Sequence, residues 1–317
     1  MMKTVLAFLL MVWASVVSAQ TFPSKPLRIV VPFPGGVADS LSRMLAPKMG
    51  ESLGQPVVVE NKPGGSGQIG ALEVIRAPAD GHTIFLGHIG THAVNPHVFA
   101  KLNYDPDDLR PVTLLITVPN LLVVHPSLPA ANVRELVAHA RANPGRLSYA
   151  SPGSGSSGHL AAELFKSIAG VDIVHVPYKG AAPALQDLMG GQVQVLFDTL
   201  AQALPQAKAG KVRALAVTTL QRQAVAPEVP TMVEQGFPGW ETGPWFGLFL
   251  RAGTPDPAAA RIQQEAVKAL LAAEVRDRLA SLGATVAGTS AEEFAAFIRA
   301  ERARWGKVVR EAGIRAD

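Results

Sequence analysis

The chain has 317 residues, of which 48% are hydrophobic and 17% are charged, and it contains no cysteine. This composition excludes a disordered chain and any disulfide framework, and the length predicts about two domains. The formal net charge is +4. Its basic residues are scattered, and those near the C-terminus fit a solvated helix face, so we expect no nucleic-acid partner.

The N-terminus has the pattern of a secretory signal peptide. Lys3 precedes an apolar segment from Val5 to Val17, and Val17-Ser18-Ala19 supplies small residues for cleavage before Gln20. A membrane-spanning helix needs about 20 apolar residues, which disfavours a retained anchor. We therefore predict a signal peptide over residues 1–19 and export to a bacterial periplasm.

The remaining chain shows strand and helix patterns in the same order twice. The expected strands are 27–31, 56–60 and 83–87 in the first half, and 147–150, 172–176 and 192–197 in the second. Helices between them are expected to bury Leu41, Met44, Leu45 and Met49 in the first half, and Leu160, Leu164, Phe165 and Ile168 in the second. Further helices are expected near 69–76 and 183–189. This alternation predicts an α/β fold with mostly parallel sheets flanked by helices.

Two apolar segments are candidates for strands that cross between the halves. They are Val118–Val124 and Trp245–Leu250, and they divide the chain into lobe 1, residues 20–122 plus 246–317, and lobe 2, residues 123–245. The tail from 257 to 309 is expected to be helical. A stripe at helical spacing predicts packing there, through Phe294, Phe297, Ile298, Trp305 and Val308.

A glycine-rich loop follows the first strand of each half and precedes a helix. The two loops are Pro32–Asp39 and Ser151–Gly158. Small residues let a ligand approach the backbone, and a helix N-terminus offers free N–H groups and a positive dipole end. The pair predicts two lobes that hold one anionic ligand, with the serines of the second loop as further hydrogen-bonding groups.

The spacing G-x-G-x-x-G at 65–70 and 153–158 raises the alternative of a dinucleotide site. That site also needs an acidic residue at the end of the following strand. Asp172 stands at the start of its expected strand, and no acid ends the strand at 83–87, so we expect no cofactor. Asp39, at the start of a helix, is compatible with helix capping, with ligand contact, or with both.

Histidines and serines raise two more alternatives. His88 and His92 have the i, i+4 spacing of metal ligands, but Gly90 and Pro96 disfavour a helix there. We expect a loop over 87–95 with His88 and Thr91 as polar contacts, and no metal. A hydrolase would need His159 beside the loop serines and an orienting acid, and the chain lacks a G-x-S-x-G elbow, so we expect no enzyme.

These motifs together resemble the periplasmic substrate-binding proteins of tripartite tricarboxylate transporters, the Bug family. The matching segments are 25–36 with Asp39, 57–61, 63–67, 78–81, 90–96, 143–145, 175–180, 190–193 and 211–217. Val37 is a departure, because many relatives carry proline, serine or threonine near that position.

The resemblance implies a two-lobed periplasmic-binding-protein fold (Venus-flytrap, type II-like) with two crossing strands. It also implies a small di- or tricarboxylate or aromatic acid as ligand, delivery to membrane components of the transporter, and a monomer. A ligand-sensing adaptor for a membrane kinase remains an alternative. The implied ligand-binding residues are Phe33, Pro34, Gly35, Gly36, Asp39, His88, Thr91, Ser151, Gly153, Ser154, Gly155, Ser156, Ser157, Tyr178, Lys179, Gly180 and Asp198.

Overall fold

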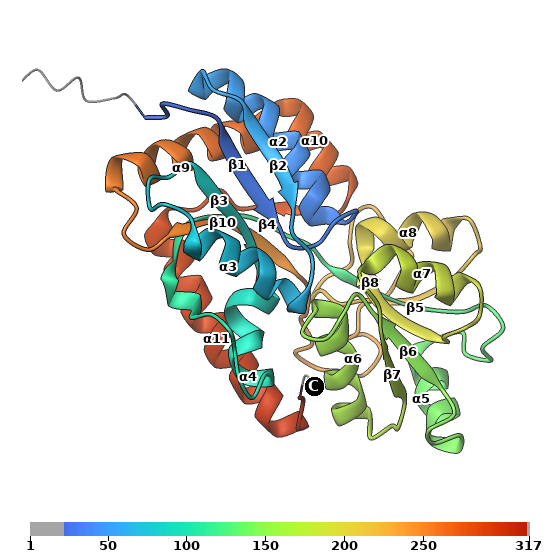
Figure 1. Ribbon diagram of the computed structural model, residues 1–317. Coiled ribbons are helices and arrows are strands. Elements are labelled where there is room, and N and C mark those ends of the chain that lie inside the picture. The colour runs from blue at the N-terminus through green and yellow to red at the C-terminus, as the bar shows by residue number, and fades with distance from the viewer. Residues whose placement is uncertain (1–21, 316–317) are drawn as a thin grey trace, which may run out of the picture.

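The computed structural model describes residues 22–315, which form two lobes that each contain one β-sheet covered by helices on both faces (Figure 1). In Figure 1 the blue-to-cyan and orange-to-red segments build the first lobe, and the green-to-yellow segments build the second. The predicted signal peptide lies outside the described residues. Among the helices that are described, none combines the length and apolarity needed to cross a membrane.

The first sheet has the strand order β11-β4-β10-β3-β1-β2. Its strands are β1 (Leu27–Val31), β2 (Val57–Asn61), β3 (Thr83–His88), β4 (Leu109–Thr117), β10 (Trp245–Arg251) and β11 (Thr285–Val286). β1 runs parallel to β2 and β3, whereas β10 runs antiparallel to β3 and β4. The β1 residues Leu27, Ile29, Val30 and Val31 are buried, as expected for a strand with helices on both faces.

Helices cover the two faces of the first sheet with separate hydrophobic clusters. On one face are α2 (Val37–Leu53), α9 (Asp256–Leu271) and α10 (Ala273–Ser281). On the other are α3 (Gln68–Arg76), α4 (Asn95–Val98) and α11 (Ala291–Ala312). The stripe predicted on α11 does pack: Phe294, Ile298 and Trp305 are buried in the second of these clusters.

The second sheet has the strand order β7-β6-β8-β5-β9. Its strands are β5 (Asn120–Val124), β6 (Ser148–Ser151), β7 (Val174–Pro177), β8 (Val195–Thr199) and β9 (Arg213–Val217). One face is covered by α5 (Val133–Ala142) and α6 (Ser157–Ala169), and the other by α7 (Ala181–Met189) and α8 (Leu200–Lys208).

The two sheets repeat one arrangement, as the order of sequence patterns predicts. In each, the first parallel strand lies between the other two, and an antiparallel strand follows the third: β2-β1-β3-β10 in one sheet and β7-β6-β8-β5 in the other. The sheets are therefore mixed. The parallel part that the sequence predicts is the repeated unit, and antiparallel strands are added where the chain enters or leaves a lobe.

The chain passes between the sheets at two places that lie side by side. The first is Val118–Pro119, between β4 and β5, and the second is the segment 218–244, between β9 and β10. The Val118 N–H donates to the Pro244 carbonyl at 2.9 Å and joins the two passages. The first passage is thus a short connection at strand ends, whereas the second is a longer segment, and the predicted boundary between residues 122 and 123 falls inside β5.

The segment after β3 differs from the predicted loop. Residues Gly90–Val94 form a π-helical turn that continues into α4. The Thr91 hydroxyl starts this turn, because it accepts from the His88 N–H at 3.2 Å and donates to the His88 carbonyl at 3.0 Å. Pro96 is tolerated near the start of α4, because the N–H groups of a helix's first turn have no partner within the helix and the missing N–H of proline therefore costs no hydrogen bond. A smaller correction is Ile168 on α6, which is 55% exposed rather than buried.

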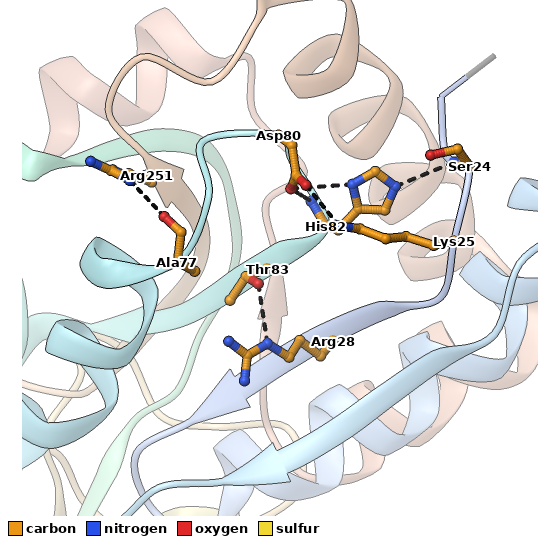
Figure 2. A network of polar contacts seen from close by, with 8 residues as sticks. All are labelled: Ser24, Lys25, Arg28, Ala77, Asp80, His82, Thr83 and Arg251. Atoms are coloured by element: carbon orange, nitrogen blue, oxygen red, sulfur yellow. Dashed lines mark hydrogen bonds and ion pairs between the residues drawn. The ribbon is translucent and has the colours of Figure 1, made fainter. Parts of the chain in front are cut away.

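The segment that precedes β1 is fixed to the amino end of the first sheet (Figure 2). Lys25 pairs with Asp80 at 2.9 Å, and the Ser24 N–H donates to the His82 ring at 3.3 Å. Phe22 packs edge-on against the same ring, with centroids 5.0 Å apart. These contacts lie at the end of β1 and β3 opposite to the glycine-rich loops.

The α11 stripe yields a stability prediction. Phe294 is fully buried against Trp245 and Phe249, with ring centroids 5.7 and 5.0 Å away. Phe294→Ala should lower the free energy of unfolding by about 3–5 kcal/mol, because it removes a large apolar side chain and leaves a cavity. Urea denaturation measures this. The exposed Arg299 on the same helix is the control, and Arg299→Ala should change the value by less than about 0.5 kcal/mol.

Candidate functional site

A cavity lies between the two lobes where the carboxyl ends of β1, β3, β6 and β8 face each other. Its wall from the first lobe consists of Phe33, Pro34, Gly36, Val37, Ala38, His88 and Ile89, with Pro244 and Phe246 beside them. Its wall from the second lobe consists of Asn120, Pro152, Ser156, Ser157, Gly158, Gly180, Ala181, Phe197, Asp198, Thr199 and Gln202. Carboxyl ends of parallel strands are the usual position of ligand sites in α/β folds.

Four helices begin at this cavity. α2 begins after Gly36, α6 after Ser156, α7 after Gly180 and α8 after Thr199, and each of these residues lines the cavity. The cap residues of α2, α7 and α8 form no side-chain capping bond. Helix N-termini present free N–H groups and a partial positive charge, so the cavity favours an anion. Among its described lining residues there is no lysine or arginine.

His88 is a neutral hydrogen-bond donor in the cavity wall. The Gly90 N–H donates to His88 Nδ1 at 2.9 Å, so the ring proton belongs to Nε2. Burial lowers the pKa of His88 to about 3, which keeps the ring uncharged near pH 7. Within the described residues, buried Nε2 has no hydrogen-bond partner.

Asn120 and Asp198 are buried polar residues that the second lobe contributes to the cavity wall. Both side-chain atoms of Asn120 and the Oδ2 atom of Asp198 have no hydrogen-bond partner among the described residues. Asp198 Oδ1 accepts from the Thr199 N–H at 2.7 Å. Burial raises the pKa of Asp198 to about 7, although the Thr199 N–H opposes the rise. Buried polar atoms without partners are rare in proteins, and their grouping around one cavity points to a ligand.

Apolar side chains form the rest of the wall. Phe33 packs edge-on against His88 with ring centroids 4.7 Å apart, and Phe197, Phe246 and Ile89 add further apolar surface. A few polar groups in an otherwise apolar wall are typical of small-molecule sites. The arrangement suits a ligand with charged ends and an apolar middle.

Hydrogen bonds join the two lobes directly. Ser66 Oγ donates to the Ser154 carbonyl at 2.5 Å, and Gln202 Nε2 donates to the Gly35 carbonyl at 3.3 Å. Ser66 adopts a left-handed backbone conformation with φ 55°. The G-x-G-x-x-G motif at 65–70 therefore makes a contact between lobes in the described chain.

The structure places the residues predicted for the site in two groups. Phe33, Pro34, Gly36, His88, Ser156, Ser157, Gly180 and Asp198 line the cavity. Gly35, Asp39, Thr91, Ser151, Gly153, Ser154, Gly155, Tyr178 and Lys179 lie outside its lining. Several residues of the second group form hydrogen bonds within their own lobe, and the Gly35 and Ser154 carbonyls accept hydrogen bonds from the other lobe.

Asp39 and Tyr178 show what the second group does. Asp39 accepts from Asn61 at 2.9 Å and from Arg43 at 3.2 Å. Burial would raise the pKa of Asp39, but the net shift is downward because these hydrogen bonds stabilise the carboxylate. The hydrogen bonds hold the start of α2 next to the end of β2. The Tyr178 hydroxyl donates to Asp187 at 2.7 Å.

The serines and histidines of the second loop form a structural network. Ser151 Oγ lies 2.7 Å from His175 Nε2, but Ser151 is fully buried and lies outside the cavity lining. The Gly155 N–H donates to His159 Nδ1 at 3.2 Å, and Ser156 Oγ caps α6 by accepting from the His159 N–H at 3.3 Å. The histidines thus hold the loop in shape, and among the described residues neither Ser156 nor Ser157 forms a hydrogen bond from its hydroxyl to a histidine ring.

Twelve lining residues are absent from the predicted set, and Asn120, Gln202 and Phe246 are three of them. Asn120 and Phe246 stand near the amino ends of antiparallel strands, which no glycine-rich loop marks. Gln202 lies in the first turn of α8. For Asn120 alone a signal existed, since it is the single polar residue in the apolar run from Val118 to Val124.

The buried histidines predict how stability depends on pH. Burial lowers the pKa of His88 to about 3 and those of His159 and His175 to about 4, from an ordinary value of 6.5. Below pH 6.5 the unfolded chain binds protons that the folded chain does not. The contribution of these histidines to the free energy of unfolding should therefore be at its maximum above pH 6.5 and should decrease as the pH falls to about 4.

Urea denaturation at pH 7.5 and pH 5.0 tests this, with the lower value expected at pH 5.0. Asp198 opposes the trend because its raised pKa favours the folded state in acid, but it is one group against several. His175→Gln should reduce the pH dependence by about 1.4 kcal/mol per pH unit. Equal stability at the two pH values would contradict neutral buried imidazoles.

Comparison with known proteins matches residues 41–314 to the family described as Tripartite tricarboxylate transporter family receptor, TctC. Protein BugT of Bordetella pertussis is 37% identical over 303 residues, which are 95% of this chain and 93% of the relative. A UPF0065 protein of Pseudomonas sp. strain P51 is 41% identical over 299 residues, covering 93% of this chain and 89% of the relative.

Solved structures agree. Rpa4515 of R. palustris with adipate has a TM-score of 0.89 and 40% identity, covering 93% of this chain and 99% of the other. MatC from Rhodopseudomonas palustris with bound malate has a TM-score of 0.87 and 37% identity, covering 91% and 100%. The chain belongs to the TctC family of tripartite tricarboxylate transporter receptors, which includes Bug proteins, and it has their two-lobed fold.

Proposed function

We propose that the chain is a periplasmic solute-binding protein that captures a small organic carboxylate between its lobes and delivers it to the membrane components of a tripartite tricarboxylate transporter. The observation that carries this proposal is the meeting of four helix N-termini at one cavity. They supply fixed N–H donors for an anion without a charged side chain.

The wall suits a dicarboxylate with a short apolar chain. Helix α2 from the first lobe can hold one carboxylate, and helices α6, α7 and α8 from the second lobe can hold the other. Phe33, Ile89 and Phe246 offer apolar surface to the chain between them. Hydrogen bonds to charged groups contribute about 1.5–3 kcal/mol each, so a few suffice for about micromolar affinity. The bound adipate and malate of two relatives support this class of ligand.

Capture without chemistry fits the residues around the cavity. Among the described lining residues, none is a nucleophile hydrogen-bonded to a histidine or carboxylate base. The family description supports transport over sensing as the main role. Export to the periplasm is supported by relatives that are described as periplasmic proteins, and the monomeric state stays a prediction.

Titration calorimetry with adipate and malate tests the proposal. Both acids should bind, and each should raise the melting temperature in proportion to the logarithm of its concentration over the dissociation constant. Adipamide, which keeps the chain and replaces both carboxylates by neutral amides, is the matched control and should not bind. If adipamide bound as well as adipate, or if a panel of small carboxylates gave no binding, the proposal would be wrong.

A substitution at Asn120 distinguishes a loss of ligand contact from a loss of folding stability. Asn120→Leu keeps the approximate shape and removes an amide that makes no hydrogen bond with the described residues. The affinity for a bound carboxylate should fall about 10- to 100-fold, because the amide donor to a charged group is lost. The free energy of unfolding should not fall. Gln192→Leu, at an exposed position of the second lobe, is the control and should leave the affinity unchanged.

A further inference from the structure

Asp198 is an acid in a site otherwise built for anions. It is the penultimate residue of β8, next to Thr199, the cap residue of α8; it is 2% exposed and lines the cavity. Its Oδ1 atom accepts from the Thr199 N–H, while buried Oδ2 has no partner among the described residues. A buried carboxylate oxygen without a donor is costly in its charged form.

No described cation offsets a charge on this carboxyl group. β5, which pairs with β8, contains no titratable side chain. The titratable groups on the other elements that pack against β8, and across the cavity, are Tyr149 on β6, His159, Glu163 and Lys166 on α6, Asp187 on α7, Lys208 on α8 and His88 on the first lobe. None of them forms a hydrogen bond or an ion pair with Asp198: Glu163 pairs with Lys166 and Asp187 accepts from Tyr178.

From this geometry, and on the basis of the function proposed above, we propose that Asp198 takes up a proton from solution when the ligand binds and donates it in a hydrogen bond from Oδ2 to a ligand carboxylate. The proton converts the Asp198 carboxylate to a carboxylic acid, and the ligand stays fully ionised. Two carboxylates in hydrogen-bond contact cannot both remain charged without a counter-ion, so one of them must hold a proton.

The other way to satisfy Oδ2 is an ionised Asp198 that accepts from a ligand ammonium group. The helix N-termini disfavour a ligand ammonium group at that place, since the positive ends of α6, α7 and α8 all lie in the same wall. A carboxyl proton is therefore the better donor, and an amino acid ligand becomes an outcome of the test.

Calorimetry with adipate from pH 6 to pH 9, in buffers of different ionisation enthalpy, measures the protons taken up on binding. Adipate is fully ionised over most of this range. Since burial raises the pKa of Asp198 to about 7, uptake should rise from near zero at pH 6 to about one proton at pH 9. The dissociation constant should increase about tenfold per pH unit in the upper part of the range.

Asp198→Asn supplies a neutral amide that can donate without titrating. Its affinity for adipate should not depend on pH, should exceed that of the unaltered protein at pH 9, and should involve no proton uptake. Asp172→Asn, at an exposed position of the second lobe, should keep the original proton uptake. An infrared difference spectrum on adding adipate should show a protonated carboxyl band that Asp198→Asn lacks.

The outcomes separate this inference from the proposed function. Failure of all carboxylates to bind would contradict the proposed function. Adipate binding without proton uptake, or uptake that persists in Asp198→Asn, would overturn the role of Asp198 alone. Tight binding of aspartate but not of adipate, lost in Asp198→Asn without proton uptake in the unaltered protein, would show an ionised Asp198 that accepts from an ammonium group.

Discussion

The site depends on the geometry of a strand followed by a loop and a helix. In a parallel βα unit the helix begins at the carboxyl end of the strand, so its free N–H groups lie at the edge of the sheet. The chain repeats this unit with the same strand order in both lobes. Because the two edges face each other, four helix N-termini lie around one cavity, and the repeated fold alone accounts for their position. The proposed anion site is thus a consequence of the duplicated fold.

Because dipoles supply the positive potential, the side chains around the cavity can remain neutral. Burial keeps the His88 imidazole uncharged, and the same burial raises the pKa of Asp198 into the physiological range. A site built on lysine or arginine would hold Asp198 ionised through a salt bridge. In this wall the acid lacks such a partner among the described residues, which makes its protonation state sensitive to whatever ligand arrives.

The sequence predicted the repeated strands, both glycine-rich loops and the packing role of the α11 stripe, because each rests on local periodicity or on a local loop motif. It could not separate Gly36 and Ser156, which line the cavity, from Asp39 and Ser154, which do not. Within one loop that difference depends on how the lobes meet. The turn after β3 was missed because side-chain hydrogen bonds of the Thr91 hydroxyl to the His88 backbone, which residue spacing does not reveal, stabilise a helix where Gly90 and Pro96 suggest none.

The glycines of the second loop were expected to admit a ligand to the backbone, and the structure assigns one of them to a contact between lobes. A Cβ atom at Gly155 would lie 2.8 Å from Asn95 Oδ1, and one at Gly90 would lie 2.9 Å from the Gly155 carbonyl oxygen. Both positions show that the turn after β3 in the first lobe is in close contact with the loop after β6 in the second lobe. Ser66, which donates to the neighbouring Ser154 carbonyl, belongs to the same contact. Small residues are therefore required there even without a ligand, because a larger side chain would hold the lobes apart and separate the helix N-termini that face each other across the cavity.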